Sequence, residues 1–135
     1  MAKATAAGAK RVIPLNVSGA FHSPLMDAAA LGLSQALADV AVQPASIPVI
    51  ANATAEPVTE PQAIRESLAR QLLSPVRWEA SVRHLLEDPG PPFLEVGPGK
   101  VLRGLLRAID RRTPVQGVGG PEEIDTVAGS EGSTS

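Results

Sequence analysis

The sequence contains no cysteine among its 135 residues, so neither disulfide bonds nor thiolate metal sites can form. Aromatic residues make up only 2% of the chain, too few for the stacking platforms that bind nucleic acid. No apolar run approaches the roughly 18 residues of a membrane span, and residues 1–10 lack the apolar segment of a signal peptide. The 12 basic and 14 acidic residues are well mixed, so no basic field favours nucleic acid or an anionic membrane. We therefore expect a cytoplasmic protein with no nucleic-acid or membrane partner.

The hydrophobic fraction is 44%, which suffices for a core built mainly from Leu, Val, Ile and Ala. Short apolar runs alternate with helical patterns, as in α/β folds with a parallel sheet. Strands are predicted at residues 11–17, 47–51, 93–96 and 113–118, with a loop at 52–59. Helices are predicted at residues 24–40 and 61–72, from about residue 75 to 87, and at 101–109. Such a thin sheet leaves its edges exposed, so we expect the chain to be part of a larger fold.

One of only two histidines lies where a predicted strand meets a predicted helix. Residues 19–26 read Gly-Ala-Phe-His-Ser-Pro-Leu-Met, which places His22 in the loop after the strand at 11–17. Ser23 suits the N-cap of the next helix, and Pro24 suits its first position. Loops at strand ends of α/β folds often carry catalytic side chains. His22 is therefore a candidate general base, although a histidine taken alone is more often structural.

A second glycine-rich junction lies near the C-terminus, where residues 95–102 read Glu-Val-Gly-Pro-Gly-Lys-Val-Leu. It lacks the Gly-x4-Gly-Lys-Ser/Thr spacing of a phosphate-binding loop, and Val101 occupies the place of the magnesium-binding hydroxyl. We assign the glycines to a tight turn from strand to helix. Glu95 is expected to brace that turn through hydrogen bonds to the backbone.

Taken together and in order, these segments resemble the malonyl-CoA:acyl carrier protein transacylases. The resemblance runs from about Gly8 to Leu106 and includes residues 48–52, 70–72 and 75–78. It implies an α/β fold, namely the C-terminal part of an α/β-hydrolase-like acyltransferase core with a short parallel sheet flanked by helices. Residues 1–10 would end the last helix of a small ferredoxin-like subdomain, and residues 11–118 would belong to the core. Residues 119–135, rich in Gly, Glu, Ser and Thr, are expected to form a disordered tail.

The resemblance also implies roles for three residues. His22 matches the catalytic histidine of a Ser–His pair that moves a malonyl group from coenzyme A to the phosphopantetheine thiol of the carrier protein. Gln71 matches a position whose backbone carbonyl orients that imidazole. Phe21 resembles the form associated with malonyl rather than methylmalonyl selection, because a bulky ring there would crowd an α-methyl branch.

The family's nucleophile has no counterpart in this sequence. The serine belongs to a Gly-His-Ser-x-Gly elbow, and no Gly-x-Ser-x-Gly occurs in the 135 residues. The family's arginine for the malonyl carboxylate and its oxyanion-hole glutamine belong to the same unmatched half. We therefore expect the chain alone to be inactive, with malonyl-CoA, acyl carrier protein and an N-terminal half as partners. No metal and no cofactor are expected, because the coenzyme A thioester is the substrate.

Two other interpretations remain open beside a transacylase of fatty acid biosynthesis. The chain would also fit a fragment of a polyketide synthase acyltransferase domain, or a truncated non-catalytic protein acting as an interaction module. Among the remaining polar and aromatic residues, His84 is expected on the surface and Trp78 in the core. Four arginines near one helical face predict a solvated surface or, less commonly, a docking patch for an acidic carrier protein: Arg103, Arg107, Arg111 and Arg112.

Overall fold

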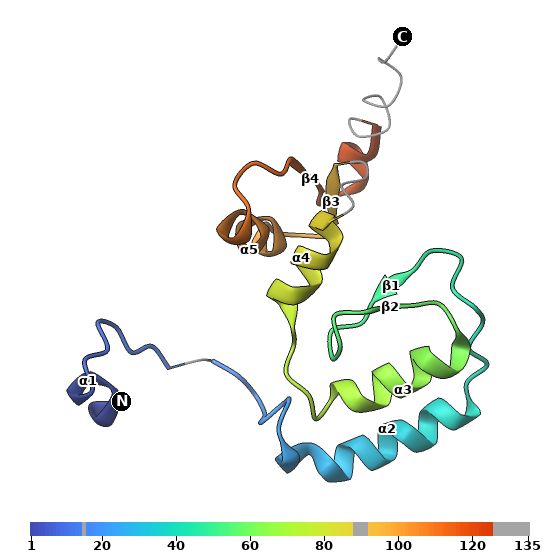
Figure 1. Ribbon diagram of the computed structural model, residues 1–135, viewed down its shortest axis with the longest axis horizontal. Coiled ribbons are helices and arrows are strands. Elements are labelled where there is room, and N and C mark those ends of the chain that lie inside the picture. The colour runs from blue at the N-terminus through green and yellow to red at the C-terminus, as the bar shows by residue number, and fades with distance from the viewer. Residues whose placement is uncertain (15, 88–91, 126–135) are drawn as a thin grey trace.

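Two separate two-stranded sheets, each with helices beside it, organise the chain (Figure 1). The computed structural model describes residues 1–14, 16–87 and 92–125. The helices are α1 (Ala2–Ala6), α2 (Asp27–Asp39), α3 (Pro61–Gln71), α4 (Trp78–Glu87) and α5 (Val101–Ile109), with short 3-10 turns η1 (Pro24–Met26) and η2 (Pro121–Glu123). The strands are β1 (Val49–Ile50), β2 (Pro57–Val58), β3 (Phe93–Val96) and β4 (Val115–Val118). The predicted α/β class is confirmed.

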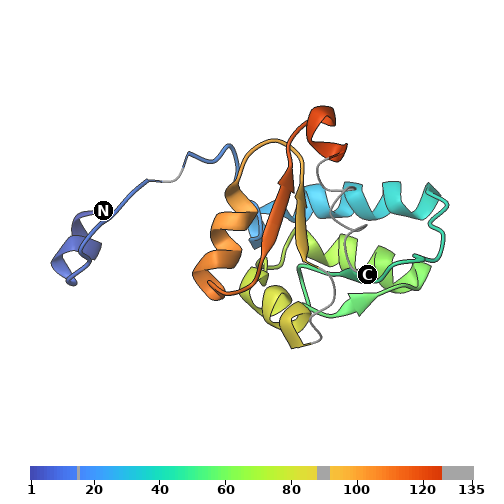
Figure 2. The same ribbon diagram turned by 90° about the horizontal axis from the view of Figure 1, so that it is seen from above.

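The β3–α5–β4 unit is a parallel strand pair joined by a helix. Phe93 lies opposite Val115 and Val96 opposite Val118, with the register unbroken between them. A parallel pair needs such a crossover because its strands run in the same direction. Strand β3 and helix α5 have the predicted bounds, whereas β4 begins two residues later than predicted. Figure 2 shows β3 and β4 beside α5.

The β1–β2 pair is an antiparallel hairpin, so the prediction of one parallel sheet is wrong for this part of the chain. Val49 on β1 lies opposite Val58 on β2. Strand β2 falls within residues 52–59, for which the sequence predicts a loop. The reversal is tight, because the amides of Thr54 and Ala55 both donate to the Ala51 carbonyl, at 3.2 and 2.7 Å. Ala55 adopts a positive φ of 64° to complete the turn. A turn this short can join only antiparallel strands.

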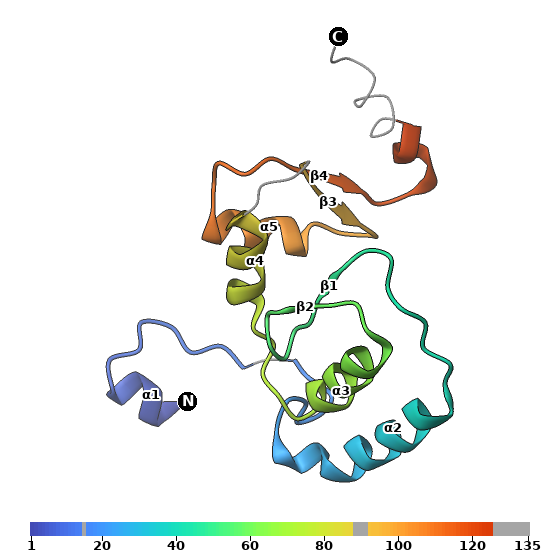
Figure 3. The same ribbon diagram turned by 45° about the vertical axis from the view of Figure 1, so that its right-hand side comes forward.

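Helices α2 and α3 pack against each other below the hairpin (Figures 1 and 3). The guanidinium of Arg65, on α3, donates to the carbonyls of Leu37 and Val40 at the C-terminal end of α2. The last carbonyls of a helix have no partner within it, and the helix dipole makes this end negative. Arg65 therefore provides hydrogen bonds to carbonyls at the C-terminal end of α2, and these bonds join α2 to α3.

The strand predicted at residues 11–17 is absent from the described part of that segment. Residues 11–14 and 16–17 form no strand. The physical reason is that a strand forms only against another strand, and neither sheet contains a partner for this segment. In sequence these described residues lie between η1 and α1, and α1 stands away from the other elements (Figure 1).

Three smaller predictions also need correction. The Ser23 hydroxyl makes no capping hydrogen bond and donates instead to the Ala20 carbonyl at 2.7 Å, although Pro24 does open the following turn. Helix α4 begins at Trp78 rather than near Pro75. Trp78 is only half-buried, yet its indole N–H is buried without a hydrogen-bond partner. The predicted disordered tail, residues 119–135, is not one of these three, because it lies mostly outside the described residues, which end at residue 125.

The described residues bury few side chains. The buried apolar side chains are those of Ala30, Ala51, Ala55, Val82 and Leu106. Many large apolar side chains remain exposed by comparison, including Leu25 at 82% and Val96 at 75%. A surface of this kind is typical of a chain that packs against further protein. Among the described helices, none combines the length and the apolar character needed to cross a membrane.

Candidate active site

His22 is held at two points by the C-terminal end of α3. Its backbone N–H donates to the Leu72 carbonyl at 3.0 Å, and its ring nitrogen Nδ1 lies 3.0 Å from the Gln71 carbonyl oxygen. The residue has a positive φ of 63°, a conformation that costs energy for any residue with a Cβ. Two anchors on adjacent carbonyls fix both the backbone and the ring of His22 in this conformation.

The Gln71 carbonyl also sets the tautomer of the imidazole. A carbonyl oxygen can only accept a hydrogen bond, so Nδ1 must carry the proton in this contact. In the neutral ring the lone pair then lies on Nε2, at the far side of the imidazole. His22 is exposed, so Nε2 is open to a reactant. The arrangement suits a general base, with a backbone carbonyl in the position that a carboxylate takes in a Ser-His-Asp triad.

The carbonyl of Gln71 is itself fixed by a turn at the end of α3. The side-chain amide of Gln71 donates to the Ser74 carbonyl at 3.3 Å. The Ser74 amide donates back to the Gln71 carbonyl at 3.2 Å. The sequence did not single out Leu72 or Ser74, because their part in the site is played by backbone atoms, which carry no residue-specific signal.

Phe21 lies next to His22, and the residue is 51% exposed. The ring packs over Gly19, where a Cβ would come within 3.1 Å of the Phe21 Cε2 atom. Gly19 therefore leaves room for the ring beside the loop. His22, Gln71 and Phe21 all lie where the loop at 19–23 meets the end of α3. Their catalytic and selectivity roles stay predictions.

No nucleophile accompanies His22 among the residues that the structure describes. The nearest serine in sequence, Ser23, donates its hydroxyl to the Ala20 carbonyl and not to the imidazole. The second histidine, His84, is on α4, 39% exposed in its side chain and 3.9 Å from a Glu87 carboxylate oxygen. The described residues also contain no cluster of three or more His, Cys, Asp or Glu side chains that would bind a metal ion.

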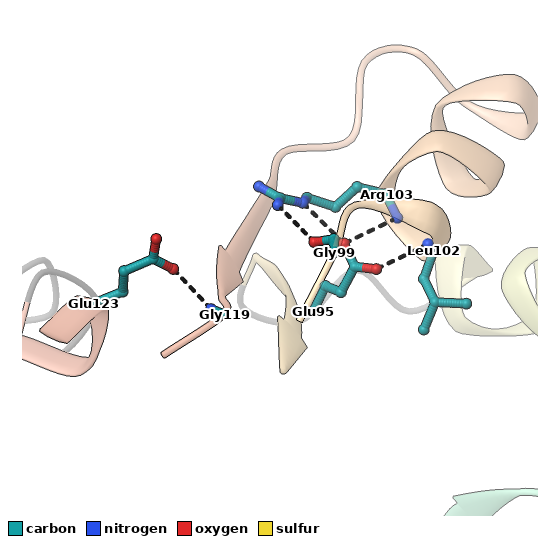
Figure 4. A network of polar contacts seen from close by, with 6 residues as sticks. All are labelled: Glu95, Gly99, Leu102, Arg103, Gly119 and Glu123. Atoms are coloured by element: carbon teal, nitrogen blue, oxygen red, sulfur yellow. Dashed lines mark hydrogen bonds and ion pairs between the residues drawn. The ribbon is translucent and has the colours of Figure 1, made fainter. Parts of the chain in front are cut away.

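Glu95 braces the β3–α5 turn (Figure 4). Its carboxylate accepts hydrogen bonds from the Leu102 amide at 2.9 Å, and from the Arg103 amide and Nε at 3.3 and 2.9 Å. These amides open α5, where backbone N–H groups have no partner within the helix. The Arg103 side chain also lies across β4, where a Cβ on Gly117 would come within 2.5 Å of the guanidinium carbon.

The pKa of Glu95 follows from this setting. Burial of the carboxylate acts to raise its pKa, but hydrogen bonds from Leu102 and Arg103 and the charge of Arg103 outweigh burial. The pKa is therefore held below its ordinary value of 4.5. A depressed carboxyl pKa means that the ionised form stabilises the fold. That contribution is complete above pH 4.5 and is lost as the pH falls through the lower pKa of the folded state.

We expect Glu95→Gln to lower the melting temperature at pH 7 by on the order of a few degrees. The amide keeps the shape of the side chain but loses the charge that attracts Arg103 and the start of α5. Differential scanning calorimetry from pH 7 to pH 3 measures the effect. The difference between the variant and the parent should shrink below pH 4.5, and a constant difference at all pH values would contradict the assignment. Glu66→Gln, on the exposed side of α3, is the control.

Comparisons with known proteins connect this geometry to a family. No protein-family model matches the chain. The malonyl CoA-acyl carrier protein transacylase of Bacillus subtilis (strain 168) is 47% identical over 118 residues, which are 87% of this chain and 37% of the relative. The crystal structure of an acyl-carrier-protein S-malonyltransferase from Bartonella henselae superposes with a TM-score of 0.88 at 35% identity. The superposition covers 97% of this chain and 42% of the relative.

The chain is homologous to the C-terminal portion of the malonyl-CoA:acyl carrier protein transacylases. A third match is a solved complex between a malonyl-transacylase and its type II PKS acyl-carrier protein, with 36% identity and a TM-score of 0.84. It covers 93% of this chain and 41% of the transacylase. The chain thus spans about two fifths of the length of the transacylases that it matches.

Proposed function

We propose that the chain supplies the general base of a malonyl transfer from coenzyme A to acyl carrier protein, as in fatty acid biosynthesis. The observation that carries the proposal is the contact between His22 Nδ1 and the Gln71 carbonyl, which leaves Nε2 unprotonated. The homology supports it, since the relatives are named for this reaction. The serine nucleophile would come from the part of the transacylase polypeptide that this chain does not match.

The proposed chemistry has two symmetrical halves. Nε2 of His22 takes the proton from the serine hydroxyl as its oxygen attacks the malonyl thioester carbon. When the carbon–sulfur bond breaks, the imidazolium returns that proton to the sulfur of coenzyme A. In the second half, Nε2 takes the proton of the carrier-protein thiol, the sulfur attacks the malonyl ester, and the serine recovers its proton. No redox step and no cofactor enter this sequence.

The Gln71 carbonyl is an adequate partner for this base. The imidazolium exists only while the proton passes between serine and thiol, and the carbonyl dipole stabilises its Nδ1–H. A thiol leaving group, with an ordinary pKa of about 8.5, is much easier to expel than the amine released by a protease. The site therefore needs a partner that orients the imidazole, and that partner does not have to carry the full negative charge of a carboxylate. The fixed turn at residues 71–74 provides that orientation.

A polyketide pathway is the second candidate for the same chemistry. One of the matched transacylases was solved with a type II PKS acyl-carrier protein. The residues that touch the acyl group would be the same in both pathways, so the choice rests on the carrier protein. Initial rates with a fatty-acid carrier protein and a type II polyketide carrier protein would separate the two.

Restoring the unmatched portion tests the proposed function. The N-terminal portion of the Bacillus subtilis relative is fused ahead of Met1, and transfer of malonyl from malonyl-CoA to a carrier protein is followed by mass spectrometry. The proposal predicts a loaded carrier protein with the fusion. A folded fusion that transfers no malonyl group would contradict it.

Phe21 should control the choice between malonyl and methylmalonyl groups. In the same fusion, Phe21→Ser opens space beside the α-carbon of the acyl group, because residue 21 adjoins the base. We expect the ratio of methylmalonyl to malonyl kcat/KM to rise about tenfold, near the lower end of what one methyl group decides in a pocket. Loss of the ring also leaves a void, so both rates can fall. A flat ratio with both rates reduced would make Phe21 a packing residue. Phe93→Leu, on β3, is the control for loss of an aromatic ring.

A further inference from the structure

The connector between α3 and α4, residues 72–77, begins at the two carbonyls that anchor His22. The carbonyl of Gln71, the last residue of α3, accepts from the ring of His22, and the carbonyl of Leu72 accepts from its backbone N–H. The connector contains Pro75, whose ring fixes its own φ and restricts the residue before it. A displacement of the far end of so short and stiff a segment would therefore be passed back to both carbonyls.

Arg77 fastens the far end of the connector to the turn of the β1–β2 hairpin. Its backbone N–H donates to the Asn52 carbonyl at 2.9 Å, and its guanidinium Nη1 donates to the Thr54 carbonyl at 3.2 Å. In the part of the chain that the structure describes, these are the hydrogen bonds that join the connector to the hairpin. The connector passes beside the hairpin turn in Figures 1 and 3. The connector is therefore held at both ends, by the His22 loop and by the hairpin.

The hairpin turn is a firm support for the Arg77 side chain. Ala51 and Ala55 are buried, and the Ala51 carbonyl closes the turn by accepting from two amides. The Thr54 hydroxyl also accepts a hydrogen bond from the Glu56 amide at 3.3 Å. The guanidinium thus meets a carbonyl whose position is fixed, and a charged donor makes this bond stronger than one between neutral groups.

Arg77 is also joined to α4, although it does not belong to the buried core. Its carbonyl accepts from the Ser81 amide at 3.0 Å and from the Ser81 hydroxyl at 3.1 Å. Ser81 is buried, whereas Arg77 is exposed. Arg77 therefore acts through hydrogen bonds to three parts of the chain, and replacing its side chain removes a bond without leaving a void in the core.

We propose that Arg77 is a positioning residue for the base, because its bond to the Thr54 carbonyl holds the connector where its first carbonyls meet His22. This inference rests on the proposed function, since it concerns the same imidazole. Among the residues that the structure describes, no hydrogen bond joins Arg77 to His22 itself, so the effect passes through the connector. Loss of the guanidinium should loosen the loop of His22 and slow the reaction of bound substrate.

Amide hydrogen exchange of the 135-residue chain, followed residue by residue by NMR, tests this link without any need for activity. Arg77→Met keeps the backbone N–H and an unbranched stem but removes the guanidinium. We expect the His22 amide to exchange about fivefold faster in this variant, the effect of losing one hydrogen bond of ordinary net strength. The Ser81 amide should not change, because its acceptor is the backbone carbonyl of residue 77. An unchanged His22 amide would overturn the proposal. Faster exchange at Ser81 as well would also overturn it, since Arg77 would then support the fold in general.

Two further variants sharpen this measurement. Arg77→Lys should restore the exchange of the His22 amide to within about twofold of the parent, because a single carbonyl needs one donor and not the guanidinium fork. Arg83→Met is the matched control, since Arg83 is an exposed arginine that pairs with Glu79 one turn earlier on α4. It should leave the His22 amide within about twofold of the parent, because an exposed pair contributes little. Equal effects of Arg77→Met and Arg83→Met would overturn the proposal.

Kinetics of the fusion to the N-terminal portion of the Bacillus subtilis relative separate positioning from substrate binding. Arg77→Met should lower kcat for malonyl transfer about tenfold and leave the KM for malonyl-CoA within about twofold, because a misplaced base slows the reaction of bound substrate. A raised KM with parental kcat would overturn the proposal and make Arg77 a substrate-binding residue. A parent fusion that transfers no malonyl group would refute the proposed function, and the amide exchange of the 135-residue chain would still decide whether Arg77 positions His22.

Discussion

Incubated with malonyl-CoA, the 135-residue chain on its own is expected to acquire no malonyl group. A covalent transfer needs a nucleophile beside its base. The sequence has no Gly-x-Ser-x-Gly elbow, and the hydroxyl of Ser23 is directed to the Ala20 carbonyl instead of the imidazole. The expected difference from an active transacylase is therefore complete loss of the acyl-enzyme intermediate, not a reduced rate.

Intact-mass spectrometry checks this result. The parent mass should persist after an hour with excess malonyl-CoA, while the fusion to the Bacillus subtilis portion should gain one malonyl group. A stoichiometric adduct on a serine of the chain alone would contradict the account, and peptide mapping would then identify the serine.

The second large effect is expected at His22. In the fusion, His22→Ala should lower kcat/KM for malonyl transfer by about 10²–10⁴-fold, the usual contribution of a general base. The loss arises because the variant lacks the imidazole that is proposed to accept the serine proton. The measurement is a steady-state assay with malonyl-CoA and carrier protein.

His84 provides the matched control for that substitution. It is the only other histidine, and it lies on α4 beside Glu87. His84→Ala should leave kcat/KM within about twofold of the parent. Near-parental turnover by His22→Ala would remove His22 from the mechanism. Similar losses in both variants would indicate a general effect on folding.

The β3–α5–β4 unit was the part of the fold most readily predicted from the sequence. Its strand and helix periods are clear, and Gly97 and Gly99 mark the turn with positive φ values of 119° and 103°. The bracing role expected of Glu95 corresponds to its three hydrogen bonds to the start of α5. Local patterns sufficed here because the strands, turn and helix lie within one short stretch of chain.

The predictions failed for strands whose formation depends on a pairing partner elsewhere in the polypeptide. Residues 11–17 have strand composition but find no partner among the strands of the chain. Strand β2 was missed because it has two residues, one of them Pro57, and its existence depends on the turn at Ala55. Such short strands have no periodicity to detect. Pairing partners, not propensities, decided both cases.

The candidate site was predictable only in part. His22 could be named from its loop and from the resemblance to the transacylases. Its contact with Gln71 joins residues 49 positions apart through a backbone carbonyl, which no side-chain pattern predicts, and only the resemblance pointed to that position. The anchoring Leu72 carbonyl was not anticipated at all. Contacts made by main-chain atoms depend on the path of the chain, and that path is known only from the fold.

The tautomer of His22 tests the central claim most directly. Nitrogen-15 NMR of the uniformly labelled 135-residue chain, at a pH where the imidazole is neutral, distinguishes a protonated Nδ1 from a protonated Nε2. The Gln71 carbonyl accepts a hydrogen bond from Nδ1 of His22. We therefore predict that His22 carries its proton on Nδ1, which leaves Nε2 as the base. His84, which makes no such contact with a carbonyl among the described residues, serves as the internal reference. A proton found on Nε2 of His22 would contradict the account, because the atom that must accept the serine proton would already hold one.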